Sequence, residues 1–558
     1  MAFKINEIRQ VILKIPFVKN ILNLELRENF IIGKVEIFFK ELENPIDFNF
    51  EINAQYPLKS YDSESLKFYN INLIDFNHVM ADGSICVHTS HCTDLEQKLI
   101  IDFNSLKNWI IKYYINKDSD LNYEHIIATE DTINDTFYSY IFSDVNYDFR
   151  KGDFGEVQIS NLKWGIYKGK PLLNFLVQGF VVNQSQLIKC DWSNFYFNFE
   201  RIQSGFYIFI EDAPVKFNRF AFKNWAEFIG KLSSEFLSLL YNFEIQNKIK
   251  LSGRIIPLFI GYRTIKTENH WQVALLEIGK FPLQGVPGKI NNIKTGIWDS
   301  QLINEKITWS LSRNSSYKYF FGRGALSKII IEKRILIIGI GAIGSMVANT
   351  LTRGGCKNID FVDYDVKEPE NVCRSEYMFF TGITNKADEL KNILSAISPF
   401  VNIQSLNNNY FESYFKSYHK DSECRAKFAE ELNKYDLIFD CTTDNDLMYV
   451  LDALDLTTEL INMSITNHAN ELVCAFYPNI YQFVINQFSN ILKNDVDDLH
   501  NPTGCWSPTF KASYNDINVL VQLALKHINI LFAGERLKNN FVIETDKMNF
   551  SNLKIVEY

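Results

Sequence analysis

Apolar and polar residues follow three different patterns along the 558-residue chain. Between about residues 17 and 75, short alternating runs such as 30–40 and 46–52 are bounded by Asn, Pro and Ser, which is typical of an antiparallel meander. Between about residues 150 and 300, strand-like and helix-like runs are mixed. From about residue 315, near-continuous apolar runs alternate with helical segments, which indicates a parallel sheet covered on both faces.

The same periodicity predicts the individual elements. Strands are expected at 174–182, 205–212, 335–339, 358–363, 401–406 and 436–440. Helices are expected at 1–15, 104–116, 223–245 and 515–532, with Asn104 as the N-cap of the second. The Gly- and Pro-rich segment 279–292 is expected to be a linker or an exposed loop.

These changes of pattern predict an α/β multidomain protein, because a chain of this length is too long for one hydrophobic core. We expect an N-terminal α+β domain at 1–125 and a middle α+β domain at 126–310. A Rossmann-like domain with a largely parallel sheet is expected at 311–558. The sequence of the middle domain does not indicate its role.

Composition excludes several classes of protein. There are 57 Lys and Arg against 66 Asp and Glu, a net charge of −9 without a long basic run, so a nucleic-acid partner is not expected. No signal peptide and no uninterrupted run of 18 apolar residues is present, so no membrane partner is expected. The nine cysteines are widely spaced and form no CxxC, which favours free thiols in a reducing cytoplasm and gives no zinc-ribbon spacing.

A glycine-rich turn follows the strand expected at 335–339. Gly339-x-Gly341-x-x-Gly344 lies between that strand and a helical pattern, so backbone N–H groups at the helix N-terminus would hold a phosphate. Asp363 ends the next strand, where an acidic residue binds ribose hydroxyls. The two features together predict a nucleotide, and both NAD and ATP satisfy them.

Residues farther along the chain favour ATP. Asp363-x-Asp365 is followed by Asn371-x-x-Arg374 and then by Lys386. Arg374 and Lys386 can neutralise phosphate charge when ATP is cleaved between its α and β phosphates, whereas hydride transfer needs no such cation pair. Asp440 and Asp444 follow the strand at 436–440, and a carboxylate at that edge can hold the Mg²⁺ that accompanies ATP.

This ordered set of motifs resembles the adenylating domain of the ThiF/MoeB and ubiquitin-activating family over about residues 315–540. The resemblance implies ATP and Mg²⁺ as cofactors and a nucleotide site made by Gly339, Gly341, Gly344, Asp363, Asp365, Asn371, Arg374, Lys386 and Asp444. The segment Asp440-Cys-Thr-Thr-Asp444 is one residue longer than the family pattern, so either Asp could bind Mg²⁺, and we favour Asp444. The resemblance also implies a homodimer in which one subunit supplies an arginine to the other. Arg323 is a candidate, and a solvated surface charge explains it equally well.

Two cysteines are candidate nucleophiles. Cys505 lies in a turn-rich loop just before the helix at 515–532, where the helix dipole would stabilise a thiolate. Thioester-forming members of the family carry a cysteine beyond the late Asp, so the resemblance implies a catalytic role for Cys505, the alternative being a buried, inert thiol.

Cys86 belongs to a second resemblance. Tyr56-Pro57 followed by Gly83-Ser84-Ile85-Cys86 resembles ubiquitin-conjugating enzymes over about residues 1–120, which implies that Cys86 carries a thioester. The HPN tripeptide of that family is replaced by Phe76-Asn77-His78, so His78, or Asn77 shifted by one position, would have to serve as the oxyanion donor.

Three neighbours of Cys86 have other interpretations. Cys92 lacks the Gly-x-Ile step, which favours packing or surface exposure. His88 and His91 could act as acid or base or could simply be exposed loop residues.

Together these resemblances imply an activating enzyme fused to a conjugating enzyme. ATP would adenylate a protein C-terminal carboxylate, Cys505 would take the acyl group, Cys86 would receive it, and a target lysine would form the amide. The domain order resembles the conjugation enzyme of bacterial CBASS anti-phage operons, which implies the C-terminus of a cGAS-like cyclic-oligonucleotide synthase as the substrate.

Three other functions remain open at this point. The substrate could be a ubiquitin-like or sulfur-carrier protein ending in Gly-Gly. The chain could be an NAD-dependent oxidoreductase with an N-terminal binding module. It could also be an inactive scaffold, in which the altered HPN tripeptide reflects lost activity.

Overall fold

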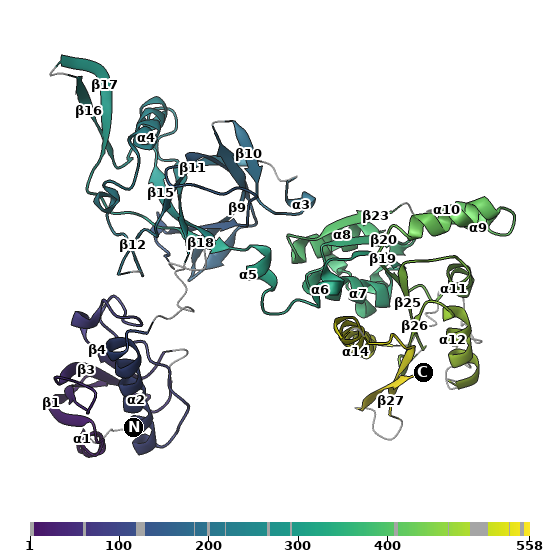
Figure 1. The fold of residues 1–558 in the computed structure, drawn as a ribbon, viewed down its shortest axis with the longest axis horizontal. Coiled ribbons are helices and arrows are strands. Elements are labelled where there is room, and N and C mark those ends of the chain that lie inside the picture. Colours follow the sequence, from purple (N-terminus) through teal and green to yellow (C-terminus); the bar gives the residue numbers. More distant parts are fainter. Residues whose placement is uncertain are drawn as a thin grey trace. The chain divides into compact units, whose positions relative to one another are not determined.

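The computed structural model of the protein is drawn in Figure 1. Its chain divides into two compact units. The first comprises residues 1–137, 149–154 and 206–312, and the second comprises 138–148, 155–205 and 313–558. The structure describes residues 5–59, 63–118, 129–183, 185–197, 201–217, 219–264, 268–290, 293–406, 411–466, 468–491, 512–534, 536–546 and 552–558.

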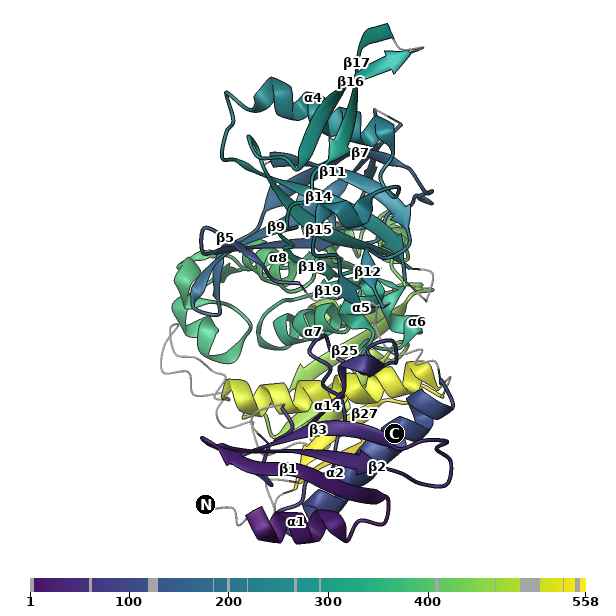
Figure 2. The ribbon, with the colours of Figure 1, turned by 90° about the vertical axis from the view of Figure 1, so that its left-hand side faces the viewer.

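The N-terminal part of the first unit is an antiparallel meander packed against two helices (Figure 2). Its strands pair in the order β1-β2-β3-β4, as the alternating pattern predicts. Phe103 of the second helix packs edge-on against Phe50 and Phe68 of the sheet. The elements are α1 Ile5–Leu13, β1 Val18–Arg27, β2 Phe30–Ile37, β3 Ile46–Asn53, β4 Leu66–Tyr69, a 3-10 turn Ile71–Leu73, and α2 Leu95–Trp109, continued by a π-helical turn Ile110–Ile115.

The start of α2 corrects a sequence prediction. The helix begins at Leu95 rather than near Asn104, because Asp94 is the N-cap and its side chain accepts a hydrogen bond from the Gln97 N–H at 2.8 Å. The first turns of α2 carry several charged residues, which hide the apolar periodicity in the sequence. Two of these charged residues, Lys98 and Asp102, are nevertheless buried.

Lys98 and Asp102 form a buried ion pair inside the first unit. Each is 2% exposed. Lys98 also donates to the Thr89 hydroxyl at 2.7 Å, and the Tyr56 hydroxyl donates to Asp102 at 2.9 Å. Burial raises the pKa of Asp102, and the Lys98 ammonium opposes that shift. The network therefore ties α2 to Tyr56 and to the segment that follows Cys86.

The central part of the chain is divided between the two units. In the first unit β11 pairs parallel with β14, which pairs antiparallel with β15, and in the second unit β9 pairs antiparallel with β7, β8 and β10. The elements are β5 Thr132–Ile133, β6 Thr136–Phe142, β7 Phe154–Asn161, β8 Gly165–Tyr167, β9 Lys170–Val182, β10 Gln186–Lys189, α3 Asn194–Phe197, β11 Arg201–Glu211, β12 Val215–Lys216, β13 Phe220–Ala221, α4 Ser234–Asn247, β14 Ile255–Arg263, β15 Asn269–Glu277, β16 Leu283–Ile290, β17 Ile293–Leu302 and β18 Leu311–Asn314.

Two predictions for this part of the chain are wrong in detail. The segment 279–292 is not a linker, because β16 pairs with β17 in a hairpin beside α4 (Figure 1). A Cβ at Gly285 would overlap the ring of Tyr241 in α4, so this glycine marks close packing. The helix expected at 223–245 is split into a 3-10 turn at Trp225–Phe228 and α4, whose N-cap Ser233 accepts a bond from the Phe236 N–H.

The second unit contains an eight-stranded sheet in the order β23-β20-β19-β24-β25-β26-β27-β28. The first five strands are parallel, which confirms the predicted Rossmann-like core, and the last three add antiparallel pairs that the sequence pattern did not predict. The strands are β19 Arg334–Ile338, β20 Asn358–Val362, β21 Val366–Lys367, β22 Thr384–Asn385, β23 Asn402–Ser405, β24 Leu437–Asp440, β25 Glu459–Ile465, β26 Glu471–Phe476, β27 Phe541–Thr545 and β28 Leu553–Glu557.

Helices cover both faces of this sheet. Ile335 and Ile337 of β19 join a core with α7, α8 and α14, whereas Leu336 and Ile338 join a second core with α10, α11 and α12. Successive side chains of a strand point to opposite faces, so the near-continuous apolar run follows from this burial. The helices are α5 Tyr317–Phe321, α6 Lys328–Ile331, α7 Ala342–Arg353, α8 Lys386–Ile397, α9 Glu412–Ser417, α10 Ser422–Leu432, α11 Asn445–Asp452, α12 Ile480–Asn486 and α14 Tyr514–Ala533.

By length and composition alone, α14 is apolar enough to cross a membrane. Within the structure, 44% of that apolar window is buried. Ile517, Leu520 and Val521 lie in the core beneath the sheet. We therefore interpret α14 as a core helix of the second unit.

We expect Lys98→Ala to destabilise the N-terminal part of the first unit by about 3 kcal/mol, because the substitution leaves Asp102 buried without its counter-charge. Hydrogen exchange of peptides from α2 in the full chain measures this change as faster local opening. The matched control is Lys14→Ala, which removes an exposed ion pair to Glu96 of the same helix and should change the opening free energy by less than about 1 kcal/mol. Equal effects of the two substitutions would contradict the prediction.

Candidate active site

The glycine turn lies at the carboxyl end of β19, at the point where the sheet order reverses. The second strand, β20, pairs on one side of β19 and the fourth, β24, on the other, so successive connections diverge there, which is where open α/β sheets bind ligands. Ile338 of β19 is in register with Asp440 of β24. The residues that follow these three strands therefore meet at one edge of the sheet.

The three glycines have different physical roles. Gly339 has a φ of +76°, and a Cβ there would lie 2.8 Å from the Thr442 methyl group. A Cβ at Gly344 would overlap the carbonyl oxygen of Gly339. A Cβ at Gly341, the N-cap of α7, would meet no atom within 4 Å. Gly339 and Gly344 therefore allow the close packing, whereas Gly341 leaves open space at the helix N-terminus.

Asp363 lies beside this turn, as the sequence predicts for a ribose-binding acid. Its carboxylate accepts bonds from the Ile340 N–H and from the Asp365 N–H, both at 2.8 Å. The buried Tyr377 hydroxyl donates to the Ile340 carbonyl, which fixes the turn from its other side. Burial is the main cause of the raised pKa of Tyr377, so this hydroxyl remains a donor.

Lys386 is the first residue of α8, and its ammonium pairs with Asp365. The Lys386 side chain is 9% exposed, whereas Asp365 is largely exposed, so the structure brings Lys386, Asp365 and Asp363 together. Arg374 is half-buried at the end of a 3-10 helix, Pro369–Arg374. The Asn371 side chain accepts a bond from the Glu368 N–H at 2.9 Å and so forms a capping box at the start of that helix.

The segments that carry Arg374 and Lys386 are held together by a buried ion pair that the sequence did not predict. Lys367 and Glu389 lie 2.9 Å apart, and both side chains are at most 2% exposed. Lys367 also donates to the Met378 carbonyl at 2.8 Å, and Glu389 accepts from the Met378 N–H at 2.9 Å. The pair joins the chain that follows Arg374 to α8, which begins with Lys386. In the sequence both residues resemble ordinary surface charges.

Glu376 makes a second connection that the sequence does not reveal. Its carboxylate accepts one bond from the Asn349 amide of α7 at 2.6 Å and another from the Tyr514 hydroxyl of α14 at 2.7 Å. Burial, together with the Glu376 carboxylate, raises the pKa of Tyr514 to about 12. The segment after Arg374 is thereby fixed to both helices.

The two candidate Mg²⁺ ligands have different surroundings. Asp440 is buried, and its oxygens accept bonds from the Thr442 N–H, the Thr442 hydroxyl and the Asn462 amide. Burial raises the pKa of Asp440, and these hydrogen bonds oppose the rise. Asp444 is exposed, and one of its oxygens caps α11. Thr443, in the loop between the two acids, has a φ of +56°. This geometry favours Asp444 as the acid that faces a ligand.

Among the described residues, no group of three or more His, Cys, Asp and Glu side chains could hold a metal ion. A single carboxylate with substrate phosphate oxygens is the usual way in which Mg²⁺ is bound in nucleotide sites, and Asp444 fits that arrangement.

Cys86 lies in the first unit on a turn fixed by backbone contacts. Gly83 has a φ of +83°, and a Cβ there would lie 2.8 Å from the Ile71 nitrogen. The Cys86 N–H donates to the His78 carbonyl at 2.7 Å. The thiol is half-buried, and its sulfur lies 4.0 Å from Nε2 of His88. Burial, followed by the charge of Glu64, raises the pKa of Cys86.

The two candidate oxyanion donors are arranged differently. His78 has a φ of +63°, and its ring packs against Tyr113 at a centroid distance of 4.6 Å. The Asn77 side-chain amide donates to the Asp118 backbone carbonyl at 3.3 Å, and the Asn77 backbone carbonyl accepts from the Trp109 indole. Cys92 contacts the Asp94 carbonyl at the N-terminus of α2, which agrees with a packing role.

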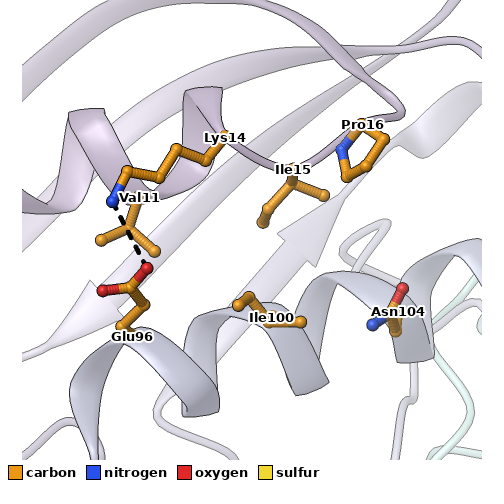
Figure 3. Close-up of a pocket in the computed structure, with 7 residues that line it drawn as sticks. All are labelled: Val11, Lys14, Ile15, Pro16, Glu96, Ile100 and Asn104. Carbon is orange, nitrogen blue, oxygen red and sulfur yellow. Dashed lines mark hydrogen bonds and ion pairs between the residues drawn. The ribbon is translucent and has the colours of Figure 1, made fainter.

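The remaining predicted residues are Cys505, Arg323 and His91. Cys505 lies outside the described residues. Arg323 is exposed in the turn after α5, and His91 is exposed beyond Cys86. A small pocket of about 100 Å³ between α1 and α2 contains none of the predicted site residues (Figure 3). It is lined by Val11, Lys14, Ile15, Pro16, Glu96, Ile100 and Asn104.

Comparison with known proteins agrees with the C-terminal geometry. The ThiF family model matches residues 311–482, which include the glycine turn, both cations and the Asp440–Asp444 loop. This part of the chain is therefore similar to the ThiF family. The ATP-dependent ubiquitin transferase-like protein Cap2 of Enterobacter hormaechei subsp. hoffmannii (strain UCI 50) is 28% identical over 242 residues, which cover 41% of this chain and 38% of that protein.

Ubiquitin-like modifier-activating enzyme 5 of Arabidopsis thaliana is 34% identical to the chain over 121 residues, which cover 20% of this chain and 27% of that protein. Among solved structures, E. coli MccB with ATP matches with 15% identity and a TM-score of 0.30, over 41% of this chain and 64% of that one. The chain thus spans less than two thirds of the length of each of these relatives.

We expect Gly344→Ala to destabilise the C-terminal Rossmann-like domain by about 2 kcal/mol, because the added methyl group overlaps the Gly339 carbonyl. Gly341→Ala is the matched control and should change stability by less than about 1 kcal/mol, since its φ is negative and its Cβ meets no atom. Hydrogen exchange of peptides from α7 in the full chain compares the two. The interpretation is wrong if Gly341→Ala opens α7 as readily as Gly344→Ala.

Proposed function

We propose that the chain is an enzyme that uses ATP to adenylate a protein C-terminal carboxylate and then transfers the acyl group through thioesters. The single observation that carries this proposal is the meeting of the glycine turn, Asp363 and Lys386 at the switch point of a ThiF-like domain. Similarity to a protein named as an ATP-dependent ubiquitin transferase-like protein supports ATP and acyl transfer.

Each residue of the site has a chemical role in this proposal. Backbone N–H groups at the start of α7 would hold phosphate, and the open space at Gly341 would let the ligand approach. Asp363 would exchange a backbone partner for a ribose hydroxyl. Lys386 would leave Asp365 to bind phosphate, and Arg374 would neutralise charge that develops during cleavage.

A Mg²⁺ ion would be held by Asp444 and by oxygens of the triphosphate. When bound, it supplies charge neutralisation and orients the phosphates for in-line attack. Asp440 would keep a structural role, because its carboxylate is buried and fixed by Thr442 and Asn462.

The proposed sequence of steps follows from leaving-group chemistry. The substrate carboxylate attacks the α-phosphate, pyrophosphate leaves, and the acyl group becomes a mixed anhydride with AMP. Cys505 attacks this carbonyl and AMP leaves. Cys86 then takes the acyl group from Cys505, and a lysine amine attacks the Cys86 thioester to form an amide.

The proposal includes a ubiquitin-conjugating-like identity for the N-terminal part, which the Gly83 turn and the half-buried Cys86 support.

The finer substrate proposal is the C-terminus of a cGAS-like cyclic-oligonucleotide synthase, processed by a cytoplasmic homodimer. It is supported by the domain order and by the similarity to Cap2. A second candidate substrate is a ubiquitin-like protein ending in Gly-Gly, which the similarity to ubiquitin-like modifier-activating enzyme 5 favours.

Exchange of radiolabel between pyrophosphate and ATP tests the adenylation step. We expect exchange in the presence of a substrate C-terminus, and we expect Lys386→Ala and Arg374→Ala each to reduce it roughly 100-fold, because each removes a charge that stabilises the transition state. Lys391→Ala, on the same helix as Lys386, is the control and should exchange at the wild-type rate. Absence of exchange with both candidate substrates, together with tight NAD binding, would favour the oxidoreductase instead.

Intact-protein mass spectrometry tests the order of the two thiols. With ATP and either candidate substrate, Cys505→Ala should form no thioester, because the first acceptor is missing. Cys86→Ala should accumulate the thioester on Cys505, and Cys92→Ala should behave like the wild type, since its thiol packs against α2. Equal adducts on the Cys505→Ala and Cys86→Ala variants would overturn the proposed order of transfer.

A further inference from the structure

The histidine two residues after Cys86 faces its sulfur. Nε2 of His88 lies 4.0 Å from Sγ of Cys86, and the two residues are in a segment that is neither helix nor strand. Val87 between them is buried, whereas Cys86 is half-buried and His88 is exposed. His88 is exposed, so its ring can exchange protons with water. Nucleophile and base within reach of each other form the basic unit of acyl-transfer sites.

The residue after His88 is held more firmly than an ordinary loop residue. The N–H of Thr89 donates to Glu64 at 3.0 Å, and its hydroxyl donates to the other oxygen of the same carboxylate at 2.9 Å. The buried Lys98 ammonium donates to that hydroxyl at 2.7 Å. Thr89 is thereby fixed by both its backbone and its side chain, and this restricts where His88 can lie.

The surroundings of Cys86 create a need for a proton acceptor. Burial and Glu64 raise the pKa of the thiol, so near neutral pH it is mainly protonated. The charged groups that face this segment are Glu64 with its partner Lys59, and Lys98 with its partner Asp102. The Glu64 carboxylate disfavours a thiolate, and the Lys98 ammonium is paired with Asp102. A thiol in this position must lose its proton during attack.

Other nearby groups are less suited to accept this proton. The His78 ring packs on Tyr113, and it is the backbone carbonyl of His78 that binds the Cys86 N–H. The Cys92 thiol contacts Asp94 and Gln97 at the start of α2. Among the described residues, His88 is the histidine with a side-chain contact to the Cys86 sulfur that can be assigned.

We propose that His88 is the proton-transfer residue of Cys86 and that Thr89, held by Glu64 and Lys98, positions it. This inference rests on the proposed acyl transfer. As the Cys86 sulfur attacks the thioester carbonyl, its proton moves to Nε2 of His88. The bond from the carbonyl carbon to the donor sulfur then breaks, the departing thiolate takes the proton from the imidazolium, and His88 returns to its neutral form. Protons and charges balance without a further reactant.

Transfer between thiols tests the role of His88 in the full chain. We expect His88→Ala to slow the appearance of thioester on Cys86 about 100-fold while the thioester on Cys505 forms at the wild-type rate. His91→Ala is the matched control, an exposed loop histidine three residues farther on, and should leave both rates unchanged. A wild-type transfer rate in His88→Ala would overturn the proposal.

Alkylation tests the pairing without ATP or substrate. Iodoacetamide modification of Cys86 is followed by peptide mass spectrometry, with Cys92 in the same molecule as the reference thiol. His88→Ala and Thr89→Val should slow the modification of Cys86 severalfold relative to Cys92, and Thr89→Ser, which keeps the hydroxyl, should restore the wild-type ratio. An unchanged ratio in His88→Ala refutes the pairing. If the wild type forms no thioester but alkylation depends on His88, the acyl-transfer function fails and the Cys86–His88 pairing stands.

Discussion

The close approach of two loops at the carboxyl edge of the C-terminal sheet is the constraint on which the candidate nucleotide site depends. Gly339 lies against Thr442 with no room for a side chain, and Gly344 lies against the Gly339 carbonyl. This packing is possible because β19 and β24 are parallel neighbours, so the turn after one strand meets the loop after the other. It brings the Asp440–Asp444 loop against the turn that precedes α7, and the Asp363 carboxylate is bonded to the same turn through the Ile340 N–H.

Buried ion pairs support both candidate sites. Lys367 with Glu389 fixes the chain between Arg374 and α8, and Lys98 with Asp102 fixes the segment after Cys86 to α2. Such pairs contribute little net stability, because the cost of removing charges from water offsets much of their attraction. Their effect here is to fix the position of a loop. Lys367 and Glu389 both bond to the backbone of Met378, and Lys98 bonds to the Thr89 hydroxyl. Each loop is thereby attached to a buried ion pair.

The strands, the turn and the helix of the candidate nucleotide site could be predicted from the sequence, but the buried ion pairs that hold the surrounding segments could not. The apolar runs at 335–339 and 436–440 and the spacing of Gly339, Gly341 and Gly344 predict a strand, a turn and a helix that the structure contains. Lys367, Glu389, Lys98 and Asp102 could not be predicted as buried, since a charged residue on a helix or beside a strand is usually solvated and only the tertiary fold brings its partner near. The hairpin at β16 was missed for a related reason, because Gly285 is required by packing against Tyr241 and not by a loop.

Cys505 lies outside the described residues, and its role remains a prediction. For Cys86 the structure gives more, because burial and Glu64 raise the pKa of its thiol. In the proposed transfer this thiol must therefore lose its proton to a neighbouring group as it attacks. The His88 ring contacts its sulfur, and the bonds that fix Thr89 restrict where this ring can lie.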